Sequence, residues 1–354
     1  MDGTAVVLCE GAYLTTCGKT AHGLVRHTDR YRVLAVIDST AAGADAGEIL
    51  DGRAVGIPVV SDLEGALRAA GGPVDYLVVG VATHGGVLPD SCRLTVREAL
   101  ATGISVDSGL HQMLSEDPEF AAAAQRSGAR IRDVRRTPPR SELHPFSGEV
   151  VKVDALRLAV LGTDSGVGKR TTALCLVQGL NASGVRAEMI GTGQTSWLQG
   201  VRYGLMLDSL INDFVSGEIE HQVCRAFHEQ RPDVIVVEGQ GALTNPAYPG
   251  GFEIVAGARP DGIILQHAPS RGHYDGFPDY PLAGVEKEKA LLELLSGRRV
   301  VAITLNHAGL SRAETRRLAA AYRADLGVPC CDPLVDGVEE VIAAIRARFP
   351  RVPR

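Results

Sequence analysis

Short, continuously apolar runs alternate along the first half of the chain with stretches whose apolar residues recur at helical spacing. The runs lie at 5–8, 33–37, 76–81 and 104–106, and helix-like stretches include 63–70 and 94–102. Strands that are apolar at every position are typical of a parallel sheet covered by helices on both faces. The pattern therefore predicts an α/β domain with a parallel sheet wound with helices.

This periodic pattern breaks between residues 136 and 148, where Pro, Ser and charged residues replace the apolar positions. Pro138 and Pro139 disfavour helix at this point. After the break, strands are predicted at 156–161, 234–237, 262–265 and 300–305, and helices at 169–181 and 338–349. We expect two α/β domains, spanning residues 1–140 and 141–354. The length of 354 residues agrees, because each part is long enough to bury its own core.

Composition and charge narrow the class of protein. The formal net charge is −6, and the one cationic run, 130–140, is short and contains two prolines. Nucleic-acid binding is therefore not expected, because phosphate affinity needs clustered Lys and Arg. No apolar run approaches the roughly 20 residues that span a bilayer, and the first residues lack a signal peptide's basic and apolar regions. We expect a cytoplasmic protein that does not associate with membranes.

A glycine-bearing turn between a predicted strand and a predicted helix carries the clearest chemical signal. Its residues are Gly162, Thr163, Asp164, Ser165, Gly166, Val167, Gly168, Lys169, Arg170 and Thr171. Glycines let successive backbone N–H groups point inward, the helix N-terminus adds positive potential, and a lysine reaches the distal phosphates. We expect these ten residues to form a P-loop that binds a phosphate-bearing cofactor.

Two features of this loop depart from the usual nucleotide-binding pattern. The spacing from Gly162 to Gly168 is one residue longer, and Arg170 occupies the place of the hydroxyl that normally binds Mg²⁺. A guanidinium clamps phosphate well but is a poor neighbour for a divalent cation. We therefore expect no metal site. One alternative is that Thr171 and Glu238 hold Mg²⁺, and another is that Arg170 simply points to solvent.

Polar residues follow several predicted strands, where parallel sheets bind their ligands. Glu238 ends the strand 234–237 and is a candidate base, a metal ligand through water, or a cap for the next turn. Thr192, Gln194 and Thr195 lie in a Gly-rich loop that either binds a polar substrate or forms a turn with self-satisfied side chains.

Further candidates lie in the second half of the chain. Arg271 suits a substrate carboxylate, because its planar fork binds both oxygens. His267 or His273 could remove an amine proton near neutral pH, and Asp213 could bind an ammonium or accept that proton. Asn306, which follows the strand 300–305, could read an adenine edge. Each of these residues also has a purely structural interpretation.

These residues resemble two groups of proteins. The loop and the segment 238–241 resemble dethiobiotin synthetase, an ATP-dependent ligase, over the P-loop domain. A closer resemblance, to a family long catalogued as a domain of unknown function, covers nearly the whole chain. It rests on the segments 19–26, 36–38, 108–111, 162–171, 191–195, 238–241 and 271–274. That family includes D-glutamate N-acetyltransferases and joins a Rossmann-like N-terminal domain to a P-loop NTPase-like three-layer domain with a mostly parallel sheet.

The resemblance implies an enzyme, an acyl-CoA-dependent N-acyltransferase that acts on a small-molecule amino acid. N-acetylation of D-glutamate or a related acidic amino acid, with acetyl-CoA held by the P-loop, is the simplest form of this activity. Two alternatives stay open: an ATP- and Mg²⁺-dependent ligase that activates a carboxylate, and a nucleotide-binding regulator without turnover. We also expect a homo-oligomer. A nicotinamide dinucleotide is not expected, because Asp38 ends the second strand but the G-x-G-x-x-G fingerprint is missing.

Overall fold

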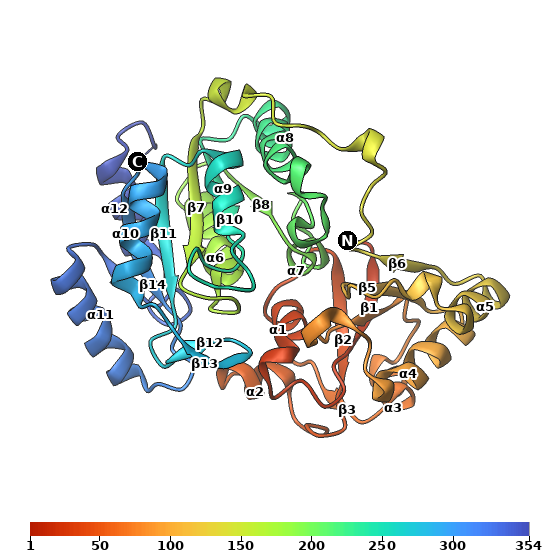
Figure 1. Ribbon diagram of the computed structural model, residues 1–354. Helices are drawn as coiled ribbons and strands as arrows, with labels where there is room; N and C mark the ends of the chain where they lie inside the picture. The colour runs from red at the N-terminus through yellow and green to blue at the C-terminus, as the bar shows by residue number, and fades with distance from the viewer. Residues whose placement is uncertain (354) are drawn as a thin grey trace. The chain divides into compact units, whose positions relative to one another are not determined.

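The computed structural model describes residues 1–353, apart from the side chain of His84. The chain forms two compact units (Figure 1). One contains residues 1–137 together with 194–201, and the other contains 138–193 together with the chain from residue 202 onward. Each unit is described by itself below.

The N-terminal unit contains a six-stranded parallel sheet in the order β3-β2-β1-β4-β5-β6. Its strands are β1 (Gly3–Leu8), β2 (Tyr31–Ile37), β3 (Val59–Val60), β4 (Tyr76–Val79), β5 (Ser105–Ser108) and β6 (Ile131–Asp133). This is the strand order of a Rossmann sheet. The central strands are apolar at nearly every position, because helices cover both of their faces. The predicted Rossmann-like N-terminal fold is confirmed.

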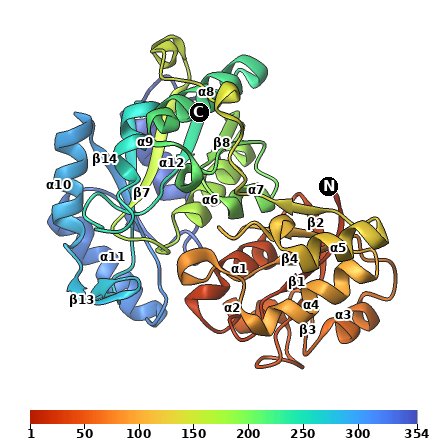
Figure 2. The ribbon, with the colours of Figure 1, turned by 45° about the vertical axis from the view of Figure 1, so that its right-hand side comes forward.

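Five helices connect these strands: α1 (Lys19–Arg26), α2 (Ala46–Asp51), α3 (Leu63–Ala70), α4 (Asp90–Ala101) and α5 (Pro118–Ser127). Because βαβ connections are right-handed, α1 and α2 cover one face of the sheet while α3, α4 and α5 cover the other. Figure 2 shows α3, α4 and α5 together on one side of the sheet. None of these five connecting helices covers β4, β5 and β6 on the face of the sheet that carries α1.

A segment from much later in the chain covers this remaining face. Helix α7 (Gln194–Leu198) packs beside α1, and Leu198 is fully buried in the N-terminal core. The guanidinium groups of Arg30 and Arg132 lie over the ring of Trp197, 3.7 and 4.6 Å from its centroid. The side chain of Gln199 donates to the carbonyl oxygens of Gly23 and His27, both at 2.8 Å. The N-terminal core is therefore built from two distant parts of the sequence.

The C-terminal unit contains a seven-stranded parallel sheet in the order β15-β14-β11-β7-β10-β8-β9. Its strands are β7 (Leu156–Gly162), β8 (Ala187–Gly191), β9 (Tyr203–Gly204), β10 (Val234–Glu238), β11 (Gly262–His267), β14 (Val300–Leu305) and β15 (Cys330–Cys331). A short antiparallel hairpin, β12 (His273–Tyr274) and β13 (Phe277–Pro281), follows β11. All carboxyl ends of the parallel strands meet at one edge of the sheet.

Helices cover both faces of this sheet, which gives three layers (Figure 1). They are α6 (Lys169–Ala182), α8 (Asn212–Gln230), α9 (Gly251–Ala258), α10 (Val285–Ser296), α11 (Arg312–Leu326) and α12 (Glu339–Arg348). Helix α6 packs against α12, and α9 packs against both α8 and α10. The predicted three-layer P-loop domain is confirmed. Within residues 1–353, none of the helices combines the length and apolar character needed to cross a bilayer.

Candidate functional site

The predicted P-loop joins the end of β7 to the start of α6. Gly166 and Gly168 have φ values of +62° and +109°, a backbone region that side chains rarely adopt, and Gly168 is the N-cap of α6. A Cβ added to Gly162 would lie 2.9 Å from Cδ of Lys169. The glycines therefore allow both the turn and the close passage of the lysine side chain. Arg170 and Thr171 lie in the first turn of α6, and both are half-buried.

Lys169 is buried and bridges two loops at the carboxyl edge of the sheet. Its Nζ donates to the carbonyl oxygen of Asp164 at 2.5 Å and to that of Gly241 at 2.8 Å. Gly241 belongs to the Gly-rich turn that follows β10. A Cβ on Gly239 in the same turn would lie 3.0 Å from Cδ of Lys169. Both glycine-rich segments thus pack directly around the lysine.

The carboxylate of Asp164 in the P-loop is fully buried and accepts several hydrogen bonds. Its Oδ2 accepts hydrogen bonds from Nη1 of Arg271 at 2.9 Å and from the backbone N–H of Asp275 at 2.8 Å. Its Oδ1 accepts from Nδ2 of Asn245 at 2.8 Å and from the backbone N–H of Ser165. Arg271, predicted to bind a substrate carboxylate, therefore already has a carboxylate partner in the P-loop.

The buried side-chain amide of Gln266 supports the P-loop. Oε1 of Gln266, in β11, accepts hydrogen bonds from the hydroxyls of Thr172 and Thr304 at 2.5 and 2.6 Å. Its Nε2 donates to the Val167 carbonyl oxygen at 3.1 Å. Nδ2 of Asn306 donates to the same carbonyl at 3.0 Å, while its Oδ1 accepts from the backbone N–H of residue 308. The Asn306 amide therefore supports the P-loop through Nδ2, while its Oδ1 is engaged by the backbone that follows β14.

Glu238 ends β10 and is buried, as expected for a residue at the carboxyl edge of the sheet. Its Oε2 accepts a hydrogen bond from the backbone N–H of Thr192 at 3.0 Å. The hydroxyl of Thr192 donates to the Glu238 carbonyl oxygen, and Nε2 of Gln240 donates to the Thr192 carbonyl at 2.7 Å. The structure thus brings together two predicted site residues, Glu238 and Thr192, at the ends of neighbouring strands.

The turn that contains Gly241 is also held by Glu288 of α10, which sequence reasoning missed. Its carboxylate accepts from the backbone N–H of Leu243 at 2.6 Å and from the hydroxyl of Thr244 at 2.7 Å. The side chain is almost fully buried, and this burial raises the pKa of the Glu288 carboxyl above its ordinary value. A single acid on a helix gives no sequence signal for such a role.

The candidate bases lie in different environments. The His267 ring is buried between the hydroxyls of Thr163, 2.9 Å from Nδ1, and Tyr322, 3.3 Å from Nε2. Burial lowers the pKa of His267 to about 4, so the ring is neutral near pH 7. His273 lies exposed in β12, and Asp213 lies exposed in the first turn of α8. Among the contacts within residues 1–353, His267 is the one of these three candidates that reaches the P-loop, through Thr163.

Two predicted substrate residues belong to the N-terminal unit. Oε1 of Gln194 accepts from Nη2 of Arg135 at 2.8 Å, and the Thr195 hydroxyl lies 2.9 Å from that of Thr20. Both side chains are buried. They therefore take part in attaching α7 to the N-terminal core, which the local sequence does not reveal.

Asp38 also has a structural role in the N-terminal unit. Its buried carboxylate accepts hydrogen bonds from the backbone N–H groups of Ala12 and Tyr13, in the loop after β1. Its other oxygen accepts from the N–H and hydroxyl of Thr40. In a dinucleotide-binding Rossmann domain, an acid at this place binds a ribose. In this protein, the backbone of the loop after β1 already donates hydrogen bonds to the Asp38 carboxylate.

Comparisons with known proteins cover both units. Residues 144–342 match the family described as "Domain of unknown function (DUF1611_C) P-loop domain", and residues 39–137 match "Domain of unknown function (DUF1611_N) Rossmann-like domain". The crystal structure of a DUF1611 family protein from Anabaena variabilis has a TM-score of 0.88 and 30% sequence identity. The similarity covers 98% of this chain and all of that one.

Two curated relatives carry the name D-glutamate N-acetyltransferase. The protein from Tritonibacter scottomollicae is 33% identical over 286 residues, which cover 79% of this chain and 83% of the relative. The protein from a Pseudoalteromonas species is 31% identical over 277 residues, which cover 75% and 80%. These relatives confirm the predicted enzyme class, a transferase. The two domain matches and the similarity over most of the chain show that this protein belongs to the DUF1611 family.

Proposed function

We propose that the enzyme transfers the acetyl group of acetyl-CoA to the amine of D-glutamate or a closely related acidic amino acid. The observation that carries this proposal is the P-loop, which combines a buried Lys169 with Arg170 in the position of the Mg²⁺-binding hydroxyl. Such a loop suits phosphates that are held rather than hydrolysed. The names of the two relatives supply the reaction and the acceptor.

The residues of the loop fit the diphosphate of coenzyme A. The left-handed glycines Gly166 and Gly168 allow the tight turn at the start of α6, and an added Cβ at Gly162 would crowd Lys169. Backbone N–H groups at a helix N-terminus favour anions, and Lys169 and Arg170 add positive charge. These residues would hold the diphosphate, and the cofactor would supply an activated thioester.

Glu238 is the residue that we assign to proton removal. A substrate ammonium must lose a proton before its nitrogen can attack a carbonyl carbon, and a positioned carboxylate can accept that proton. The hydrogen bond from the backbone of Thr192 fixes one oxygen of this carboxylate at the edge where parallel sheets bind ligands. His267 is a weaker candidate, because it is enclosed between Thr163 and Tyr322.

The proposal is tested by following thiol release from acetyl-CoA in the presence of single amino acids. We expect release that depends on D-glutamate, that is strongly reduced in Lys169→Ala at low concentrations of acetyl-CoA, and that persists in the control Lys152→Ala. Lys152 is an exposed lysine that pairs only with Glu149 of its own turn among the described residues. Consumption of ATP coupled to an amino acid, without thiol release, would instead identify the ATP- and Mg²⁺-dependent ligase.

A further inference from the structure

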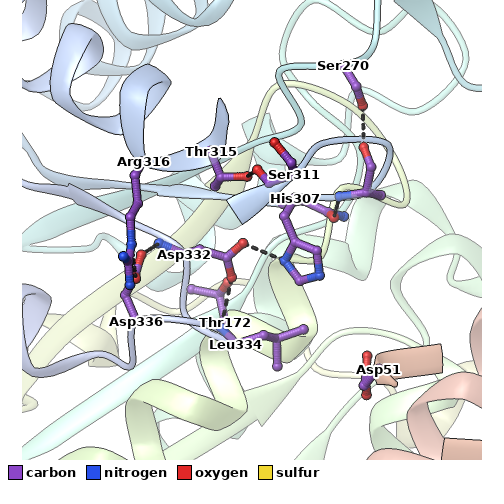
Figure 3. A network of polar contacts seen from close by, with 12 residues as sticks. Asp51, Thr172, Ser270, His307, Ser311, Thr315, Arg316, Asp332, Leu334 and Asp336 are labelled. Atoms are coloured by element: carbon purple, nitrogen blue, oxygen red, sulfur yellow. Dashed lines mark hydrogen bonds and ion pairs between the residues drawn. The ribbon is translucent and has the colours of Figure 1, made fainter. Parts of the chain in front are cut away.

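A histidine–aspartate pair lies at the carboxyl edge of the C-terminal sheet, and the proposed reaction does not use it. His307 follows β14 after one residue, and its Nδ1 lies 2.6 Å from Oδ2 of Asp332, which directly follows β15 (Figure 3). The Asp332 side chain is 1% exposed and that of His307 is 34% exposed. Asp332 is thus fixed inside the protein, while His307 reaches the surface.

The surrounding contacts fix the carboxylate in one orientation. Oδ1 of Asp332 accepts from the backbone N–H of Leu334 at 2.9 Å, which leaves Oδ2 for the imidazole (Figure 3). The backbone N–H of Asp332 donates to Asp336, whose other oxygen lies 3.7 Å from the guanidinium of Arg316. An ionised carboxylate only accepts hydrogen bonds, so Nδ1 of His307 donates to it and Nε2 is directed away from Asp332.

The position of His307 relates this pair to the P-loop. Its neighbour Asn306 donates to the Val167 carbonyl oxygen in the loop at 3.0 Å. Strand β14 lies beside β11, and β11 lies beside β7, which leads into the loop. Ligands of open parallel sheets lie across the carboxyl ends of neighbouring strands. A cofactor whose diphosphate binds at the start of α6 can therefore extend over β11 and β14 toward His307.

We propose that His307, oriented by Asp332, binds the 3′-phosphate on the ribose of coenzyme A. This inference rests on the proposed function, in which acetyl-CoA is the acyl donor. The 3′-phosphate distinguishes coenzyme A from ATP, and imidazole donates to a phosphate oxygen through Nε2 once both ring nitrogens carry protons. His307 is thus a specificity-determining residue for the cofactor.

The test compares the binding of coenzyme A and 3′-dephospho-coenzyme A by calorimetry. We expect the wild-type enzyme to bind coenzyme A more tightly, and His307→Ala to lose roughly ten- to hundredfold in affinity for coenzyme A only. Asp332→Asn should show a smaller loss with the same selectivity, because it loosens the ring without removing it. His307→Gln, which keeps an N–H donor, should retain part of the preference. His228→Ala changes an exposed histidine at the end of α8 and should bind both compounds like the wild type.

Four results would overturn the inference. Equal losses for the two compounds would show that His307 acts on the fold or on another part of the cofactor. Unchanged binding with reduced turnover would make His307 a proton-transfer residue. Wild-type binding of both compounds with equal affinity would remove the need for a 3′-phosphate ligand. If the wild-type enzyme bound neither compound, the proposed acetyl-CoA cofactor would fail together with this inference.

Discussion

Arg271 forms an ion pair with Asp164 of the P-loop, and its Nη1 lies 2.9 Å from Oδ2 of this fully buried carboxylate. Arg271 also donates to the carbonyl oxygen of Ser165 at 2.7 Å, so it contacts both the side chain and the backbone of the loop. The chain therefore shapes its P-loop with an internal ion pair. This pair connects the loop to the segment before the β12–β13 hairpin.

Removal of the Asp164 carboxylate is expected to destabilise the protein. Asp164→Ala leaves Arg271 without its charged partner and leaves Asn245 and two backbone N–H groups without an acceptor, which should cost about 3 kcal/mol. Urea unfolding followed by circular dichroism measures this loss. Asp325→Ala, at an exposed position on α11, is the matched control. If Asp164→Ala had the same unfolding midpoint as this control, the ion pair would not hold the loop.

Lys169 is expected to contribute binding energy for the cofactor phosphates. Hydrogen bonds to charged groups are worth about 1.5–3 kcal/mol, so Lys169→Ala should weaken acetyl-CoA binding roughly ten- to hundredfold. Calorimetry compares this variant with Lys152→Ala. The proposed location of the cofactor would be contradicted if both variants bound acetyl-CoA like the wild-type enzyme.

His267 makes the stability of the protein depend on pH. Burial lowers its pKa to about 4 from the ordinary value of 6.5, so its contribution is fully present above about pH 6.5. Between about pH 6.5 and pH 4 the unfolded chain binds a proton at this residue and the folded chain does not. The free energy of unfolding should therefore fall by up to about 3 kcal/mol as the pH decreases through this window.

Urea unfolding at pH 7 and near pH 4.5 measures this effect of His267. His267→Gln removes the titrating ring but keeps hydrogen-bonding groups that can face Thr163 and Tyr322, and it should show a smaller decrease in stability. An equal decrease in the variant and in the wild-type protein would exclude His267 as the source.

The N-terminal unit is expected to depend on α7. Leu198 is fully buried in its core, so Leu198→Ala should lower the free energy of unfolding by about 3 kcal/mol. Trp197, the only tryptophan of the chain, lies next to it and reports unfolding of this unit by fluorescence. Leu294→Ala, at a position that is 83% exposed, should change the transition by less than about 0.5 kcal/mol. Equal effects of the two substitutions would show that α7 contributes little.

Continuous apolar runs predicted most of the central strands. The strand at 300–305 and the helix at 63–70 have the predicted bounds, and the P-loop strand differs by one residue. A buried parallel strand is apolar at every position, so its sequence is informative without knowledge of its neighbours. Edge elements such as β3 and β15, with two residues each, were not predicted. They are too short to produce a periodic signal.

The contacts around the candidate site were harder to predict from the sequence than the strands. The motif predicted the P-loop and the position of Glu238 at the end of a strand, because their residue types and their positions after strands are local features. It did not identify Asn245 as a partner of Asp164, or Gln266 as the support beneath Val167. The position of Gln194 and Thr195 in the N-terminal unit depends on packing against residues far away in the sequence. Such long-range contacts have no local pattern.

Mass spectrometry of D-glutamate incubated with the enzyme and acetyl-CoA tests the central claim most directly. The proposed function predicts a product that is heavier by one acetyl group, that forms only with acetyl-CoA, and that forms more slowly with Lys169→Ala at the same low concentration of acetyl-CoA. L-glutamate and ATP with Mg²⁺ serve as parallel incubations that define the acceptor and the donor. An unmodified amino acid after incubation with acetyl-CoA, or a product that requires ATP, would contradict it.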